Sequence, residues 1–249
     1  MGKPILTAQG LTKVYGALKA TDGLSLEIQK GEIHAIIGPN GAGKTTAIGQ
    51  LSGELTSDEG TIYFAGKDIT RLPVYKRASL GLARSFQITS ILLNFTAEDN
   101  VAMAIQARDG HSFKFWKSAR TDGKLRAPAR EVLKEVGLAD RATIVADRLS
   151  HGEQRQLELA MALATRPNLL LLDEPMAGMG PASSRKMVDL LNALKGRITI
   201  LMVEHDMNAV FTLADRITVL VYGRAIATDT PENIQTDFAV RQAYLGEYV

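Results

Sequence analysis

Residues 33–46 read IHAIIGPNGAGKTT, an apolar run followed at once by a glycine-rich loop that ends in a lysine and two threonines. The loop fits the GxxxxGK(S/T) pattern of a phosphate-binding loop, and the run before it is typical of a buried strand. Its glycines let the backbone curl so that N–H groups point inward, while Lys44 adds a positive charge and Thr45 a hydroxyl for magnesium. A helix that begins here directs its positive dipole end at the anion. An ordinary glycine-rich turn between a strand and a helix could have a similar sequence. The predicted strand at 33–37, directly before the loop, favours a nucleotide-binding site.

Residues 169–174 read LLLLDE, which suits a buried parallel strand that delivers two acids at its carboxyl end. We expect Asp173 to hold magnesium, directly or through water, and Glu174 to accept a proton from an attacking water. A buried strand with two solvated acids at its exit would look the same in isolation. The phosphate loop upstream favours the catalytic interpretation.

Residues 149–154 read LSHGEQ, in which Ser150 and Glu153 satisfy the S-x-x-E capping box of a helix start. Apolar residues recur behind them at helical spacing, namely Leu157, Ala160, Met161 and Ala164. An ordinary amphipathic helix could begin this way. The two interpretations are compatible, because a capped helix N-terminus is itself an anion site.

The segment 149–154 resembles the signature sequence, usually written LSGGQ, of the ATP-binding cassette (ABC) ATPases, and it lies where that family places it, before the strand with paired acids. Tyr15 resembles the aromatic residue that stacks on adenine, Gln87 the glutamine of the Q-loop, and His205 the switch histidine. Taken singly, these three have ordinary alternatives as a strand aromatic, a surface residue and a structural histidine. The resemblance covers essentially the whole chain.

The resemblance implies a complete site for ATP and Mg²⁺. Two cassettes would stack head to tail, with ATP between the phosphate loop of one and Ser150 to Gly152 of the other, so that hydrolysis requires closure. Glu174 would be the base, His205 would position the water, and Gln87 would sense the phosphate side and report to a partner. The expected magnesium residues are Thr45, Gln87 and Asp173. The expected ATP contacts are Tyr15, Gly38, Pro39, Asn40, Gly41, Ala42, Gly43, Lys44, Thr45, Thr46, Ser150 and Gly152.

Three positions depart from the family pattern. His151 replaces the first glycine of LSGGQ and Glu153 replaces its glutamine, while Gly180 stands where many cassettes carry an Asp or Asn that crosses the dimer interface. The phosphate, magnesium and base positions are intact, so we still expect hydrolysis.

The fold that the motifs imply is α/β: a P-loop NTPase (RecA-like) parallel-sheet core with an antiparallel β patch and an inserted α-helical subdomain. We expect one ABC ATPase domain over residues 1–249, with the core in 1–87 and 165–249 and the helical subdomain in 88–164. Strand patterns at 24–28 and 60–66 predict the antiparallel patch. Buried-strand patterns at 33–37, 169–173, 198–203 and 217–221 predict the parallel sheet, and the strand at 217–221 is expected to be the last before a short helical tail.

Composition fits one globular unit that does not itself cross a membrane. The chain has 249 residues, 45% of them hydrophobic, and a net charge of +2. It has no cysteine, which excludes disulfides. No apolar run approaches the roughly 18 residues of a transmembrane helix, and residues 1–5 lack the apolar core of a signal peptide. Any membrane role must therefore come through a partner, and we expect a peripheral location at the cytoplasmic face of the bacterial inner membrane.

Residues 111–120 read HSFKFWKSAR, a mixture of basic and aromatic side chains. A plain loop is the first interpretation, contact with membrane or permease the second, and nucleic-acid stacking the last. The small net charge gives no wide basic footprint, so we expect no nucleic-acid partner.

Residues 15–20, 81–87 and 243–247 resemble the ATPase subunits of branched-chain amino acid importers, and the closely related urea importer subunits share the His-Gly of the signature. This kinship implies a Mg²⁺-dependent, transport-coupled ATP hydrolase that energises a permease through ATP-driven dimer closure. Its partners would be a second ABC ATPase, identical or different, integral membrane permease subunits and, indirectly, a periplasmic or extracellular solute-binding protein. Alternatives are an importer ATPase for urea or another small solute, a soluble cassette protein acting on ribosomes or DNA, and a phosphoryl-transfer kinase, which would not need the segment 149–153.

Overall fold

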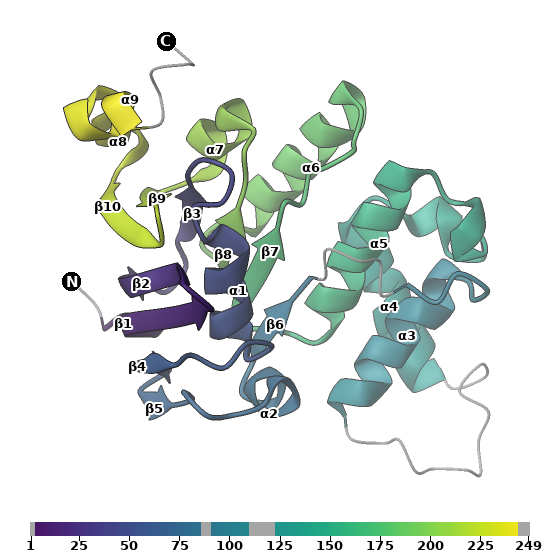
Figure 1. Ribbon diagram of the computed structural model, residues 1–249. Coiled ribbons are helices and arrows are strands. Elements are labelled where there is room, and N and C mark those ends of the chain that lie inside the picture. Colours follow the sequence, from purple (N-terminus) through teal and green to yellow (C-terminus); the bar gives the residue numbers. More distant parts are fainter. Residues whose placement is uncertain (1–2, 86–90, 110–122, 244–249) are drawn as a thin grey trace.

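The computed structural model describes residues 3–85, 91–109 and 123–243 (Figure 1). It places a four-stranded sheet and a six-stranded sheet in one part of the molecule and the helices α3, α4 and α5 to one side (Figure 1). This arrangement confirms the predicted parallel core, antiparallel patch and helical subdomain. In the part of the chain that the structure describes, no helix is long and apolar enough to cross a membrane.

The smaller sheet is antiparallel and has the order β2-β1-β4-β5. Its strands are β1 (Leu6–Tyr15), β2 (Leu18–Ile28), β4 (Glu59–Phe64) and β5 (Lys67–Asp68). The pattern at 24–28 falls within β2, and the pattern at 60–66 overlaps β4, which ends at Phe64. Apolar side chains of β1, β2 and β4 pack with helix α1 (Lys44–Ser52) in one buried cluster that also contains residues of the larger sheet. Helix α1 therefore joins the two sheets.

The larger sheet has the order β10-β9-β3-β8-β7-β6. Its strands are β3 (Ile33–Ile37), β6 (Leu82–Arg84), β7 (Leu169–Asp173), β8 (Thr199–Val203), β9 (Arg216–Val221) and β10 (Arg224–Asp229). From β9 to β6 all neighbours are parallel. Every residue of β3, β7 and β8 is buried, which explains their continuous apolar sequences.

The expectation that 217–221 is the last strand was wrong. Strand β10 follows it and pairs antiparallel with β9 across a tight turn. Tyr222 and Gly223 in this turn both have positive φ, at 48° and 77°, as the two-residue turn of a hairpin requires. Most side chains of β10 are exposed, so its sequence lacks the apolar pattern from which a strand is predicted.

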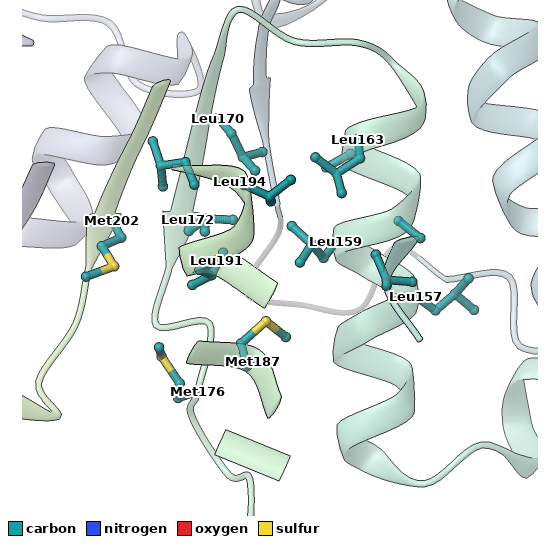
Figure 2. Packing of buried hydrophobic residues seen from close by; sticks show 14 of the residues in the cluster. Leu157, Leu159, Leu163, Leu170, Leu172, Met176, Met187, Leu191, Leu194 and Met202 are labelled. Carbon is teal, nitrogen blue, oxygen red and sulfur yellow. The ribbon is translucent and has the colours of Figure 1, made fainter. Parts of the chain in front are cut away.

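Strand β7 separates two apolar layers because its side chains alternate between the faces of the sheet. Leu169 and Leu171 belong to the cluster around α1. Leu170 and Leu172 belong to the other cluster, with residues of α5 (His151–Ala164) and α6 (Pro181–Leu194). Figure 2 shows these leucines of β7 with Leu159 and Leu163 of α5 and the apolar side chains of α6. The alternation places Asp173, the end of β7, on the α1 side.

The helical subdomain consists of α3 (Ala97–Arg108), α4 (Gly123–Glu135), two 3₁₀ turns (Ala139–Arg141 and Ala146–Arg148) and α5. Thr96 and Asp99 form a capping box at the start of α3. Buried side chains from all three helices, such as Val101, Leu133 and Leu157, join one core. Among the described residues, four short helices complete the fold: α2 (Val74–Ser79), α7 (Met207–Leu213), α8 (Pro231–Thr236) and α9 (Phe238–Ala243).

Candidate nucleotide-binding site

The phosphate loop connects β3 to α1, and its shape leaves no room for side chains at two glycines. A Cβ at Gly38 would lie 2.0 Å from the Leu220 carbonyl oxygen. A Cβ at Gly43 would lie 2.0 Å from the Ala20 carbonyl oxygen, and the φ of Gly43 is +99°. These glycines are therefore required by close packing of the loop against β2 and β9 as well as by its curl.

The N-terminus of α1 is available to an anion. Gly43 caps it without a side chain, and no acidic residue lies in its first turn. The first N–H groups of a helix have no partner inside the helix, so at this end they remain for a ligand. Thr45 is exposed and Thr46 half-buried in the same turn. Of the outer loop residues, Asn40 and Gly41 are exposed.

Lys44 is buried within the loop that it follows. Its ammonium Nζ donates to the carbonyl oxygens of Gly38 at 2.7 Å and Pro39 at 3.0 Å. Burial lowers the pKa of Lys44, and the nearby carboxylates of Glu174 and Asp173 oppose this shift. The structure thus brings the lysine of the loop within electrostatic range of both acids at the end of β7.

Asp173 has the features of a cation ligand. Its side chain is inaccessible to solvent, Oδ2 accepts a hydrogen bond from Arg84 Nη2 at 3.0 Å, and Oδ1 is buried without a partner. Burial raises the pKa of this carboxyl group, Arg84 lowers it, and the charge of Glu174 raises it. An orphaned carboxylate oxygen on the α1 side of β7 fits Mg²⁺.

A magnesium site here would use few protein ligands. Among the described residues, no group of three or more His, Cys, Asp and Glu side chains is placed to hold a metal ion. Mg²⁺ is commonly bound by one or two protein ligands together with the phosphates of the substrate. Asp173 and the Thr45 hydroxyl are the residues that would supply the protein share.

Glu174 holds a strained backbone conformation. Its φ is +49°, in the left-handed region that a residue with a Cβ seldom adopts. Its N–H donates to the carbonyl oxygen of Val203, at the end of the neighbouring strand β8, at 2.9 Å. The side chain is half-buried. The chain therefore turns sharply after β7 and is held to β8 at the residue expected to be the base.

Glu204, at the end of β8, links the loop after β7 to His205. Its carboxylate is almost fully buried; Oε1 accepts from the N–H of Met176 at 2.9 Å, and Oε2 accepts from the N–H groups of His205 at 2.9 Å and Asp206 at 3.3 Å. The His205 imidazole is largely exposed. Glu204 is not among the site residues predicted from the sequence. The available signal was an acid directly after a buried strand, the same pattern that selected Asp173.

Tyr15, at the end of β1, is 48% exposed and so is open to stacking. The Lys13 ammonium lies 5.7 Å from the centroid of its ring. Asp58 fixes this corner, because its Oδ1 accepts from Lys13 Nζ at 2.9 Å and its Oδ2 from the Val14 N–H at 2.8 Å.

The signature segment starts α5 with the predicted capping box. Ser150 Oγ accepts from the Glu153 N–H and donates to Glu153 Oε2, which also accepts from the Ser150 N–H. The hydrogen bond from the Ser150 N–H is the main cause of a lowered pKa at Glu153, whose Oε1 also pairs with Arg141 Nε at 2.9 Å. Gly152 packs against α6, since a Cβ there would lie 2.7 Å from Ser183 Oγ.

The structure shows where two residues that depart from the family pattern, His151 and Gly180, lie. His151 lies against the turn after the paired acids, because a Cβ on Gly178 would be 3.2 Å from its Cε1. Gly180 caps the start of α6. No hydrogen bond or ion pair within the described residues joins Ser150 or Gly152 to the phosphate loop of the same chain. Gln87 and the basic aromatic segment 111–120 lie outside the described residues.

Comparison with known proteins places this site in a family. The family model described as ABC transporter matches residues 21–177. The chain is 37% identical to the high-affinity branched-chain amino acid transport ATP-binding protein BraF of Pseudomonas aeruginosa, over 99% of this chain and 100% of the relative. A similar likeness, 35% identity over 99% of this chain and 100% of the relative, joins it to LivG of Escherichia coli, which carries the same description.

Solved structures agree. The ADP conformation of an ATP-binding cassette of an ABC transporter superimposes with a TM-score of 0.86 at 30% identity, covering 98% of this chain and all of that one. A dimeric cassette in a post-hydrolysis state, bound to ADP and Pi, gives a TM-score of 0.77 at 25% identity, with 91% of this chain and 98% of that one covered. The chain belongs to the ABC transporter family and is one of its ATP-binding cassettes.

Proposed function

We propose that this chain is the Mg²⁺-dependent ATP hydrolase of a bacterial importer and that ATP-driven closure of two such subunits drives a membrane permease. The observation that carries the proposal is the arrangement at the end of β7. There the buried Asp173, with its unpartnered oxygen, and the strained Glu174 lie within electrostatic range of the loop lysine Lys44. Family membership and relatives that match over their full length support it.

In this proposal each residue has a role set by its chemistry. The loop amides and Lys44 bind the phosphates, and Tyr15 stacks on the adenine ring. Thr45, Asp173 and Gln87 would bind Mg²⁺, directly or through water. When bound, the ion polarises the terminal phosphate. Glu174 accepts the proton of the attacking water and His205 positions that water. The remaining loop residues Pro39, Asn40, Ala42 and Thr46 complete the cradle.

Closure of two subunits would complete the site. The start of α5, at Ser150 and Gly152, is a capped helix N-terminus of the kind that binds anions, yet no bond joins it to the loop of its own chain in the described residues. A phosphate held by a second subunit would supply the anion. The dimeric solved relative supports this arrangement, in which the partner is a second copy of this chain or a different ABC ATPase.

A groove between the core and the helical subdomain supports a permease partner. It has a volume of about 250 Å³ and is lined mainly by apolar side chains of α2, β6, α3 and α5, including Ala78, Ala104 and Met161. Exposed apolar grooves of this kind mark interaction sites. We propose that the permease docks here, which places the chain at the cytoplasmic face of the inner membrane. The basic aromatic segment is a second candidate contact.

We further propose branched-chain amino acids as the solute, because BraF and LivG carry that description over their whole length. The solute-binding protein would act through the permease. We also propose that residues 1–249 work as one cassette, with the core in 1–87 and 165–249 and the helical subdomain in 88–164. An importer of urea or another small solute would use the same cassette chemistry, since solute identity resides in the other subunits.

The direct test is the mass of the Glu174→Gln variant by light scattering at saturating ATP and Mg²⁺. Without the catalytic carboxylate of Glu174, bound ATP is not hydrolysed. We therefore expect the variant to have the mass of a dimer. Glu59→Gln, a matched change at an exposed position on β4, should behave like the unchanged protein. Adding Ser150→Ala to Glu174→Gln should weaken the dimer. A Glu174→Gln protein that binds ATP yet stays monomeric would refute the closure mechanism.

Mass spectrometry of the gently solubilised native complex tests the transport role. Polytopic permease subunits and a solute-binding protein with affinity for leucine, isoleucine or valine are the expected companions. Ribosomes or nucleic acid without a permease would instead support a non-transport cassette.

A further inference from the structure

The Asp173 carboxylate is held by Arg84, a side chain that is not among the predicted site residues. Arg84, the last residue of β6, is paired in register with Leu171 of β7, two residues before Asp173. Registered residues of parallel strands, and residues two apart on one strand, share a face of the sheet. The pairing continues one residue further, because the Ser85 N–H donates to the Leu171 carbonyl oxygen at 2.9 Å. The backbone therefore brings Arg84 to the α1 side of the sheet beside Asp173.

The guanidinium of Arg84 bridges two carboxylates. Nη2 donates to Asp173 Oδ2 at 3.0 Å, and Nη1 donates to Glu54 Oε2 and, at 3.3 Å, to Ser52 Oγ. The side chain of Arg84 is only 8% exposed, and that of Glu54 is 34% exposed. Arg84 Nη1 is thus bound by residues at and just after the end of α1, while Nη2 is free to hold Asp173.

One oxygen of Asp173 is consequently fixed and the other is left open. Oδ2 is bound by Arg84, whereas Oδ1 is buried and has no partner in the described part of the chain. A carboxylate that is held at one oxygen cannot rotate freely about its terminal torsion. Partners that hold a metal ligand from behind orient it, and their loss commonly weakens metal binding 10- to 100-fold.

We infer that Arg84 is a positioning residue for the magnesium carboxylate: it holds Asp173 Oδ2 so that Oδ1 faces the cation, and Glu54 holds Arg84 in turn. The inference rests on the proposed function, because it assumes that Asp173 binds Mg²⁺. In this inference Arg84 binds neither nucleotide nor cation, because its guanidinium contacts Asp173, Glu54 and Ser52. It acts through Asp173, and it does so from a strand of three residues that also lines the groove between the core and the helical subdomain.

The test is the dissociation constant of Mn²⁺ from the protein–ATP complex, read from the electron paramagnetic resonance signal of free Mn²⁺. The background is Glu174→Gln, which prevents turnover, with protein in excess over ATP. Adding Arg84→Gln should raise this constant about tenfold, while the affinity for ATP in EDTA changes less than twofold. If Arg84 had only a structural role, Arg84→Gln would raise the dissociation constants of Mn²⁺ and of ATP together, or would change neither.

Arg126→Gln is the matched control, because Arg126 forms an ion pair of similar burial with Asp99 in the helical subdomain. It should lower the melting temperature and leave Mn²⁺ affinity unchanged. If Arg84→Gln does not fold, Arg84→Lys is measured instead. A lysine retains the charge but not the two-pronged fork, so we expect a rise in the Mn²⁺ constant of about threefold.

The outcomes separate the inference from the function on which it rests. If the Glu174→Gln protein binds Mn²⁺ with ATP and the Arg84 variant binds it equally well within twofold, the positioning role is wrong and the proposed function stands. If Glu174→Gln itself adds no Mn²⁺ affinity to that of ATP alone, the magnesium site is wrong and the inference is overturned with it.

Discussion

Arg77 offers the sharpest test of how the phosphate helix is held. It is 2% exposed in α2 and donates to four backbone carbonyls: Nε to Leu72 at 2.8 Å, Nη1 to Gln50 and Leu51 at 2.8 Å each, and Nη2 to Thr70 at 3.0 Å. Burial lowers the pKa of Arg77 to about 10, so the guanidinium stays charged at neutral pH. It therefore ties the last turn of α1, where a positive charge is favourable, to the loop before α2.

The cost of Arg77→Met follows from what each carbonyl loses. Gln50 keeps a donor in the Gly53 N–H at 3.3 Å, and the carbonyls of the half-buried Leu72 and Thr70 can be reached by water. The Leu51 carbonyl loses its arginine donor at a fully buried residue, at a cost of about 1–3 kcal/mol. The other bonds from a charged donor add a similar amount, and removal of a buried cation returns part of it. We expect a net loss of about 3 kcal/mol.

Urea denaturation followed by circular dichroism measures this loss, and a thermal scan should show a melting temperature lower by about 6–12 °C. Lys76→Met changes an exposed side chain on the same helix and should stay within about 0.5 kcal/mol of the unchanged protein. A loss below about 1 kcal/mol for Arg77→Met would show that the four bonds do not anchor α1.

Three further results are expected. Gly43→Ala places a Cβ 2.0 Å from the Ala20 carbonyl oxygen, so ATP affinity by titration calorimetry should fall about 10- to 100-fold; an unchanged affinity would show that the loop can relax. Glu204→Gln removes an acceptor that aligns His205, so kcat should fall about 10- to 100-fold with ATP affinity nearly constant, and an unaltered kcat would contradict the alignment. Burial lowers the pKa of His34 below 6.5, so the unfolded chain takes up the proton first and stability falls as pH drops through 6.5. The difference in unfolding free energy between the unchanged protein and His34→Gln should shrink by up to about 1.4 kcal/mol per pH unit below 6.5, and a constant difference would show that His34 is not the group involved.

The amino-acid sequence was sufficient for the features that carry a strong local signal. Each of these features, the phosphate loop, the apolar strands at 33–37 and 169–173 and the capping box at Ser150, is formed by residues within a few positions of each other in the chain. Local patterns of this kind encode backbone conformation and burial directly, because a glycine, a capping oxygen or an apolar run acts on its own segment. The family resemblance followed from the order of these segments.

Only the tertiary structure decided which polar groups meet. Arg84 and Asp173 are 89 residues apart, and the segment 81–87 gives Arg84 no partner until β6 pairs with β7. The same holds for Glu204 and the Met176 N–H, 28 residues apart. Strands β6 and β10 were missed for a related reason: one has three residues and the other is mostly exposed, so neither has a local apolar signal. Strand β6 depends on long-range pairing with β7, whereas β10 pairs with its neighbour β9 and was missed because its side chains are mostly exposed.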